Sequence, residues 1–491
     1  MAILNYNVLS KRIRERKVKK NAFVFIFISL VIFNQLIFDI KPQLAIKNNY
    51  INFYNGLLPC ATQELNIYQQ YALHTPINIS SDSDFASQGF NGSGTTDDPY
   101  KIEGFNITAS SSELIAIKDT NVHFSIKNNF LNGLSTASNA IVLFNVTYGT
   151  IEHNFVINHK SNAISLQFSN HNFIINNTVG NNDATGIKLA GWCENNSITN
   201  NMIYNNSLNG ISVLASNNNN NILYNTIRYN LGTGIKLTES NISNIIRNQV
   251  SDNHDCGIFI DTTSTVFIIN NTISNNGIDG IKVYNSLNNT LLRNFIFNNQ
   301  MNGLLLKNIR KNTLSSNIIS NNDYHGIWLE RSAFNILSNN TVSYNGQEGI
   351  LFYSSCNRNN ITDSTISYNR NNGIHLLAVE NTSISSNLIS HNVGYGLFID
   401  QSLWTSITWN NFIGNNPGGN SQVKNLGWQN SFANNYWDDR PNIEGYEQNH
   451  DENSDNLGNL FNLEPSVIIR IFILIIILCV LIILIQKQKL R

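Results

Sequence analysis

Apolar and polar residues alternate along this chain in a pattern that repeats every 23 or 24 residues between residues 140 and 416. Each copy reads approximately I-x-x-N-x-I-x-x-N-x-x-x-G-I-x-L. Apolar residues two positions apart are typical of strands, and a fixed period of this length indicates a solenoid. A small residue opens each copy: Ala140, Ala163, Gly186, Gly210, Gly234, Gly257, Gly280, Gly303, Gly326, Gly349, Gly373 and Gly396.

Two asparagine columns accompany the apolar ones. Coils stacked about 4.8 Å apart place equivalent residues above one another, so the apolar columns form one continuous core. An inward asparagine can hydrogen-bond turn amides that would otherwise be buried without partners. The first column runs Asn182, Asn206, Asn230, Asn253, Asn276, Asn299, Asn322, Asn345, Asn369 and Asn392. The second runs Asn177, Asn201, Asn225, Asn248, Asn271, Asn294, Asn317, Asn340 and Asn387. The opening glycine suits a bend that needs positive φ or a close backbone approach.

The repeat resembles that of the NosD-like, carbohydrate-binding and sugar-hydrolase (CASH) family of right-handed parallel β-helices. The segment from Pro76 to Glu103, with Gly92-Ser93-Gly94, resembles the start of such domains in archaeal surface proteins, and Asn434 to Asp439 resembles their closing motif. The resemblance covers residues 76–440. It implies an all-β fold, a right-handed, single-stranded parallel β-helix of about 12 to 13 coils. The shared residues are structural, so they specify the fold and not an activity.

The ends of a solenoid need caps, because a bare end exposes apolar columns and an open strand edge. We therefore expect an N-terminal cap and first coils in residues 76–139, repeats in 140–416, and a C-terminal cap and linker in 417–464. Residues 41–75 are expected to form a linker.

Both ends of the chain carry apolar stretches beside basic residues. Residues 1–21 form a basic segment, and 22–40 then predict a transmembrane signal-anchor or a signal peptide. Residues 467–485 predict a C-terminal transmembrane helix, long enough to cross a bilayer core. The basic tail 486–491 then lies in the cytoplasm by the positive-inside rule. These features predict a β-helix outside the cell, tethered to the membrane.

Charge and composition narrow the partners. The net charge is −1 and only 13% of residues are charged, so no bulk field favours nucleic acid. A membrane, and a polysaccharide or cell-surface glycan, are the expected partners. Many Asn-x-Ser/Thr triplets predict a glycoprotein, with Asn176 facing outward beside the inward Asn177. An asparagine-rich repeat also produces such triplets by chance.

Acidic residues supply weak catalytic candidates. The resemblance implies relatives such as polysaccharide lyases, glycoside hydrolases and epimerases, with carboxylates, sometimes with Ca²⁺, on one outer face. Asp255 and Asp279, one coil apart, are the closest acidic pair. The alternative is that they are polar turn residues in solvent. No Ca²⁺ motif is present and no cofactor is expected. NosD itself is associated with copper supply, but the three methionines and ten histidines are scattered, so no metal site is predicted.

An outward-facing column carries unexpected apolar and aromatic residues. Some of these residues lie between the two inward positions that follow each opener, and others lie two residues further along the chain. Aromatic rings on a flat exposed sheet suit sugar rings or a protein partner. The alternative is that a loop, a glycan or segment 41–75 covers them. The predicted binding residues are Phe259, Tyr284, Trp328, Tyr353, His375 and Phe398.

The sequence therefore predicts a membrane-tethered extracellular β-helix that acts as a carbohydrate-binding, partner-binding or structural surface protein. A polysaccharide-acting enzyme on the same scaffold is the alternative. A NosD-like, copper-related accessory protein is a third reading.

Overall fold

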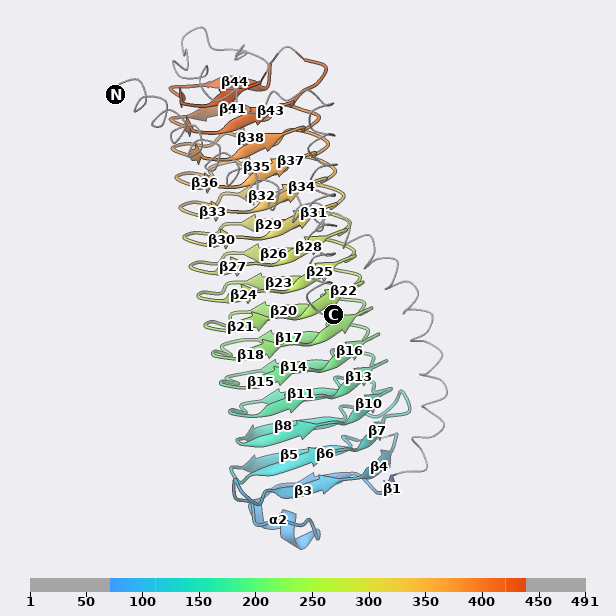
Figure 1. Cartoon of the computed structure of the whole chain (residues 1–491). Coiled ribbons are helices and arrows are strands. Elements are labelled where there is room, and N and C mark those ends of the chain that lie inside the picture. The colour runs from blue at the N-terminus through green and yellow to red at the C-terminus, as the bar shows by residue number, and fades with distance from the viewer. Residues whose placement is uncertain (1–70, 111, 420, 439–491) are drawn as a thin grey trace, which may run out of the picture. The chain divides into compact units, whose positions relative to one another are not determined.

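The computed structural model describes residues 71–110, 112–419 and 421–438. The chain winds through these residues as a rod of stacked coils (Figure 1). Each full coil contributes one strand to each of three parallel sheets, of 16, 15 and 15 strands. We call them sheet A, which contains β1, sheet B, which contains β2, and sheet C, which contains β3. Equivalent strands of successive coils are hydrogen-bonded neighbours, so the order in each sheet follows the chain in steps of three.

The strands are short, and most have three or four residues. Sheet A comprises β1 (Ala72–Leu73), β4 (Phe105–Thr108), β7 (Phe130–Asn132), β10 (Phe155–Ile157), β13 (Thr178–Gly180), β16 (Met202–Tyr204), β19 (Thr226–Arg228), β22 (Gln249–Ser251), β25 (Thr272–Ser274), β28 (Phe295–Phe297), β31 (Ile318–Ser320), β34 (Thr341–Ser343), β37 (Thr365–Ser367), β40 (Leu388–Ser390), β43 (Asn411–Ile413) and β46 (Tyr436–Trp437). Sheet B comprises β2 (Ile77–Ile79), β5 (Ile115–Thr120), β8 (Ile141–Val146), β11 (Ile164–Gln167), β14 (Ile187–Ala190), β17 (Ile211–Leu214), β20 (Ile235–Thr238), β23 (Ile258–Asp261), β26 (Ile281–Tyr284), β29 (Leu304–Lys307), β32 (Ile327–Glu330), β35 (Ile350–Tyr353), β38 (Ile374–Leu377), β41 (Leu397–Leu403) and β44 (Val423–Trp428). Sheet C comprises β3 (Tyr100–Glu103), β6 (Phe124–Lys127), β9 (Gly149–Glu152), β12 (Phe173–Ile175), β15 (Ser197–Thr199), β18 (Asn221–Leu223), β21 (Asn244–Ile246), β24 (Phe267–Ile269), β27 (Thr290–Leu292), β30 (Thr313–Ser315), β33 (Ile336–Ser338), β36 (Asn360–Thr362), β39 (Ser383–Ser385), β42 (Ser406–Thr408) and β45 (Ser431–Ala433).

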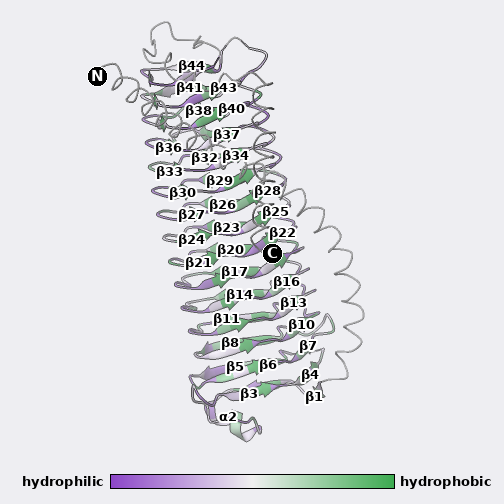
Figure 2. Cartoon of the chain, in the orientation of Figure 1, coloured by the Kyte–Doolittle hydropathy of each residue, from purple (hydrophilic) through white to green (hydrophobic). Residues whose placement is uncertain are grey.

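The core consists of the predicted apolar columns. Ile187, Ile211 and Ile235 pair in register along sheet B, and all three are fully buried. Figure 2 shows hydrophobic residues recurring on the strands from coil to coil, whereas the corners are more hydrophilic. Full burial of such a side chain stabilises the fold by about 1.5–3 kcal/mol. A coil alone could not bury these residues, so each one depends on its neighbours.

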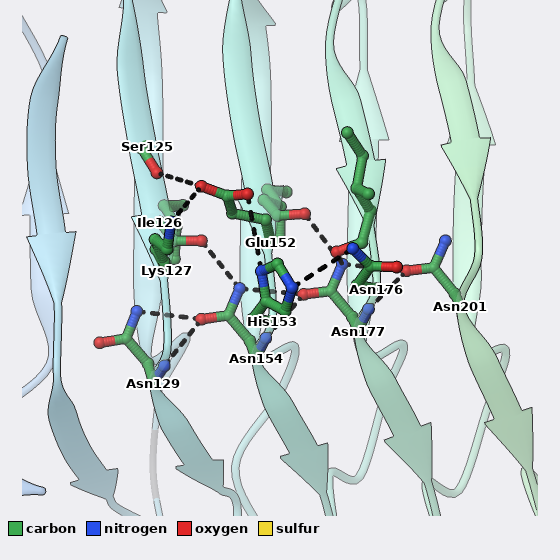
Figure 3. A network of polar contacts seen from close by, with 12 residues as sticks. Ser125, Ile126, Lys127, Asn129, Glu152, His153, Asn154, Asn176, Asn177 and Asn201 are labelled. Carbon is green, nitrogen blue, oxygen red and sulfur yellow. Dashed lines mark hydrogen bonds and ion pairs between the residues drawn. The ribbon is translucent and has the colours of Figure 1, made fainter. Parts of the chain in front are cut away.

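Buried asparagines hold the corners between sheets. Asn154 Nδ2 donates to Asn177 Oδ1 at 3.0 Å, and Asn177 Nδ2 donates to Asn201 Oδ1 at 3.0 Å (Figure 3). The backbone N–H of each also donates to the next asparagine. Asn176 is exposed and adopts φ +55°, while the adjacent Asn177 is buried, as the sequence predicted. Each corner therefore pairs a left-handed outward residue with an inward asparagine.

A third asparagine column, which the repeat analysis did not separate, lies between sheets B and C. Asn312 Nδ2 donates to Asn335 Oδ1 at 3.0 Å, and the backbone N–H of Asn335 donates to Asn359 Oδ1 at 2.9 Å. Ser243, Val266 and other residues interrupt this column. All three corners of the solenoid therefore contain a column of buried, hydrogen-bonded asparagines.

The opening glycines are required for close backbone approach and not for positive φ. A Cβ atom on Gly303 would lie 2.7 Å from the carbonyl oxygen of Gly326 and 2.4 Å from Cγ2 of Ile319. Real Cβ atoms do not approach other atoms so closely, which explains the preference for glycine at this bend.

The coils extend beyond the predicted repeat at both ends. The sheets hold about 15 coils, so the predicted 12 to 13 was too few. Pro76, Leu114 and Gln422 precede β2, β5 and β44 where other coils have a small residue, so the glycine pattern did not mark these coils, although first coils were expected within residues 76–139. At the N-terminal end, helix α2 (Asp82–Ser87) places the buried Phe85 against Tyr100, with stacked ring centroids 4.8 Å apart.

The predicted membrane segments 22–40 and 467–485, residues 41–70 of the predicted linker and the tail 486–491 lie outside the described residues. The end of the predicted linker 41–75 is described, and there Ala72–Leu73 form β1, the first strand of sheet A. Within the described part of the chain, no helix is both long and apolar enough to span a bilayer.

Candidate functional site

The six predicted binding residues all lie on the outer side of sheet B, between β23 and β41. We call this surface the sheet B face. Four of them occupy the second position of a strand and two occupy the fourth. Leu305 and Leu351, which fill the second position in β29 and β35, are only 9% and 7% exposed. The face is therefore a closely packed row and not a set of isolated rings.

Trp328 lies at the centre of the row. Its ring meets Tyr353 edge-on at 6.5 Å and His325 edge-on at 5.4 Å. Tyr353 is 41% exposed, whereas Trp328 is half-buried. Further along, His375 stacks on Phe398 at 4.6 Å with an interplanar angle of 16°. These contacts link β32 to β35 and β38 to β41, and Leu351 lies between Trp328 and His375 in the outer row.

Beside this surface lies a buried carboxylate shared by three coils. Glu348, two residues before β35, has a side chain only 8% exposed. Its Oε2 lies 2.9 Å from His325 Nδ1 in the preceding coil, and its Oε1 lies 3.5 Å from His375 Nδ1 in the following coil. Asn371 Nδ2 donates to Oε1 at 2.7 Å. We call Glu348, His325 and His375 the acid–histidine cluster.

Electrostatics keep this carboxylate ionised. Burial acts to raise the pKa of Glu348, but the interactions with the adjacent His325 and His375 outweigh it and hold the pKa well below its ordinary value. Three nearby buried atoms, Trp328 Nε1, His325 Nδ1 and His375 Nε2, have no hydrogen-bond partner within the protein. An unpaired buried polar group is costly.

The predicted acidic pair, Asp255 and Asp279, lies in neighbouring coils at one end of the sheet B face. Asp279 is almost fully buried, accepts a 2.8 Å hydrogen bond from Asn302 Nδ2 and lies 3.9 Å from Lys282 Nζ. Burial raises the pKa of Asp279. Asp255 is partly exposed and accepts a hydrogen bond from Thr233 at 3.2 Å. Asp279 is thus a structured residue and not a solvated turn residue.

The aromatic pair at this end of the face lies next to Asp279. Phe259 and Tyr284 meet edge-on with ring centroids 5.9 Å apart, and Lys282 Nζ lies 5.0 Å from the Tyr284 ring centroid. Both rings are half-buried.

Sequence analysis identified His375 as a candidate binding residue but did not pair it with Glu348. Glu348 precedes its opening glycine by one residue, while His375 follows the next opener by two. The two positions meet on a diagonal between coils, so reading single columns could not pair them. Glu348, His325 and Asp279 do share the position directly before an opener, and that column was the available signal.

A hollow lies on sheet C near the N-terminal end of the rod. It has a volume of about 320 Å³ and includes the exposed rings of Tyr148 and Phe173. Glu152, which lines it, lies 3.2 Å from Lys127 Nζ and accepts a hydrogen bond from Ser125 at 3.5 Å (Figure 3). This network is open to solvent, with Lys127 39% exposed, so its ion pair contributes little to stability.

Among the described residues, no group of three or more His, Cys, Asp or Glu is arranged to hold a metal ion. Cys193, Cys256 and Cys356 are buried in separate coils. The described residues therefore do not fit a copper site of clustered soft ligands.

The fold is a parallel β-helix, and the comparison with known families shows that the helix is right-handed. The model described as "Right handed beta helix region" matches residues 88–244 and 233–381, and the chain belongs to this family. The model "Periplasmic copper-binding protein (NosD)" matches residues 346–459. Together they confirm the resemblance to NosD-like parallel β-helix repeats. Neither match bears on an archaeal origin.

Solved structures of the same architecture are distant in sequence. The periplasmic alginate epimerase AlgG shares 14% identity over 69% of this chain and 85% of its own, with a TM-score of 0.34. The A-module of the Azotobacter vinelandii mannuronan C-5 epimerase AlgE4 shares 16% over 67% and 84%, with a TM-score of 0.35. The Dettilon tailspike protein shares 16% over 57% and 62%, with a TM-score of 0.44. No curated protein matches the sequence. At these identities the likeness concerns the fold alone.

Proposed function

We propose that this protein binds carbohydrate on the sheet B face, with Trp328 as the central contact. The observation that carries the proposal is the half-buried indole of Trp328, whose Nε1 has no partner within the protein, beside the acid–histidine cluster. Sugar sites combine an aromatic platform, which stacks on C–H groups, with a few fixed polar atoms that orient hydroxyl groups. The sheet B face offers both within three neighbouring coils.

The shape of the face favours an extended ligand. Outer side chains recur once per coil, about 4.8 Å apart, along a straight row. A polymer lying along the rod axis would meet equivalent positions in Trp328, Leu351 and His375 in turn. A compact ligand would use only one or two of them.

We further propose that the β-helix is an extracytoplasmic domain tethered to a membrane. The match to a family described as periplasmic supports the location. The apolar segments 22–40 and 467–485, each beside basic residues, support the tether.

Glycan-array screening followed by calorimetry tests the binding proposal. Trp328→Ala should weaken binding of a detected glycan roughly tenfold or more, as loss of a central aromatic contact commonly does, with little change in melting temperature. Trp192→Ala is the matched control, because Trp192 is 63% exposed at a corner outside the sheet B face. Equal effects of the two changes, or a large drop in melting temperature for Trp328→Ala without loss of binding, would assign the row to packing.

A polysaccharide-acting enzyme is the second candidate, favoured by one observation. Burial raises the pKa of Asp279, and a carboxyl group with a raised pKa can act as a general acid. Asp255 in the neighbouring coil would be the second carboxylate. Incubation with a polysaccharide panel, with assay of new reducing ends and unsaturated products, tests this function. Activity that Asp279→Asn abolishes would establish it.

A further inference from the structure

We propose that the C-terminal end of the rod rests on the surface of a phospholipid bilayer, with Trp404, Trp409 and Trp428 at the level of the lipid headgroups. We call these three residues the tryptophan patch. This inference rests on the proposed tether and adds the surface of the β-helix that meets the membrane. It follows from the exposure of the three side chains, the lack of charge around them and the predicted membrane segment that comes after them.

Exposed tryptophans gather in the last two coils. The chain has six tryptophans, and Trp404, Trp409 and Trp428 are 50%, 61% and 62% exposed. Trp404 and Trp428 lie in adjacent coils where sheet B meets sheet C, and the backbone N–H of Trp404 donates to the carbonyl oxygen of Trp428 at 3.3 Å. Trp409 lies just after the other end of β42, about 16 Å away at the usual rise of a strand. The patch therefore flanks sheet C at the C-terminal end of the rod.

The fold gives no reason for tryptophan at two of these positions. Trp404 and Trp409 adopt φ +53° and +60°, a conformation that asparagine and glycine adopt more readily than a bulky side chain. Asn339 and Asn434 occupy the position equivalent to Trp409 in other coils. Because the indoles are exposed, they add little to the core, so we infer that they serve a contact outside the rod.

The surface around the patch is almost free of charge. From Gln401 to Trp437 the sequence contains one charged residue, Lys424, although 13% of the whole chain is charged. Leu426, which is 46% exposed, adds apolar area on the last coil. Tryptophan is enriched where a membrane meets water, since its ring is apolar and its N–H is polar, whereas charged side chains are costly at the hydrocarbon boundary. The end of the rod thus has the composition of a surface that contacts lipid.

The proposed tether brings this end to the bilayer. Residues 439–466 connect the last coil to the predicted membrane segment 467–485, and 28 residues span at most about 100 Å. A tethered surface acts at a high effective concentration, so a weak contact by three indoles suffices. Residues 41–70 would provide a link of similar length at the other end. The length of the tether therefore does not choose between the two ends, whereas the tryptophan patch favours the C-terminal one.

The test uses the full-length protein in phosphatidylcholine vesicles, in which part of the lipid carries a nitroxide near its headgroup. A nitroxide quenches tryptophan fluorescence at short range, so quenching reports indoles at that depth. Flotation of the vesicles in a density gradient first checks the tether. The nitroxide lipid is expected to quench the wild-type protein. The triple variant Trp404→Phe, Trp409→Phe, Trp428→Phe should be quenched about threefold less or weaker still, because its interfacial indoles are gone.

Trp192→Phe is the matched control. Trp192 is 63% exposed at the same corner of the solenoid, nine strand steps from Trp404 and hence roughly 43 Å away, so its loss should leave the quenching unchanged. Phenylalanine removes the tryptophan fluorescence but keeps an aromatic ring, and exposed positions support no core, so the triple variant should fold. If it does not, each single replacement should still remove part of the quenching.

The outcomes distinguish this inference from the proposed tether. Protein that floats with the vesicles but shows no quenching, or equal quenching in the wild type and the triple variant, would overturn the contact and leave the tether intact. Indoles shielded from both the nitroxide lipid and aqueous acrylamide would assign the patch to another part of the chain or to a second copy, and would also overturn it. Protein that does not float would overturn the tether and the inference together.

Discussion

Asn294 Nδ2 donates a 3.0 Å hydrogen bond to Oδ1 of Asn317, its equivalent one coil further along, and also a 2.8 Å bond to the carbonyl oxygen of Ile268. The same Asn317 oxygen accepts from the backbone N–H of Asn294. One buried side chain thus links three coils. Repetition of this arrangement along the corner gives the solenoid a polar ladder parallel to its apolar core.

Replacement of Asn294 by leucine should destabilise the fold by about 1–3 kcal/mol, because neighbouring buried amides and carbonyls lose their partners. Chemical denaturation would measure the change. Asn298→Gly is the matched control. Asn298 is exposed at φ +56°, a conformation that glycine adopts without strain. Similar losses in both variants would contradict the ladder as the source of stability.

The opening glycines predict a steric effect. Gly303→Ala should cost about 1–3 kcal/mol, since the added Cβ would meet the Gly326 carbonyl and Ile319 and force the coils apart. Gly418→Ala, where no atom lies within 4 Å of the new Cβ, should have little effect. Thermal unfolding of the two variants decides whether close coil approach is the reason for glycine here.

His159 predicts acid sensitivity of the N-terminal coils. Its side chain is buried, both ring nitrogens lack partners, and burial lowers the pKa of His159 to about 4. The unfolded chain has an ordinary histidine pKa near 6.5. Between that pH and about 4, His159 therefore binds a proton in the unfolded state but not in the folded state. Stability should fall as the pH drops from about 6.5 to 4, by about 3 kcal/mol in total.

His159→Asn should remove this pH dependence. Position 159 belongs to the asparagine column at the corner between sheets A and B, since its backbone N–H donates to Asn182 Oδ1. An asparagine there can extend the ladder. Denaturation curves for both proteins at pH 7.5 and pH 4.5 would show it, and an unchanged acid loss in the variant would assign the effect to other groups.

The proposed tether predicts a topology. An epitope tag placed after Arg491 should be inaccessible to antibody in intact cells and become accessible after permeabilisation, because the basic tail 486–491 is expected in the cytoplasm. A second tag in the exposed corner at Trp192 should be accessible without permeabilisation. Labelling of the C-terminal tag on intact cells would exclude this orientation.

The amino-acid sequence by itself determined the features that recur at the same position in successive coils. Ile187, Ile211 and Ile235 recur at a fixed interval, so period alone placed them in one buried column, and the same held for Asn177 and Asn201. The outward row that contains Trp328 followed from the two-residue alternation of strands. These assignments needed no knowledge of the turns.

Only the tertiary structure decided features that depend on turn geometry or on position between coils. The last coil lacks the small opener, so its existence rested on strand pairing, that of β44 with β41. The contact between Glu348 and His375 joins different positions in adjacent coils, and the turn before each strand determines that diagonal. Burial of Asp279 likewise followed from the neighbouring Asn302. The repeat period predicts which equivalent residues stack on one another. The polar contacts on the sheet B face join different positions of the repeat, and only the folded chain brings those positions together.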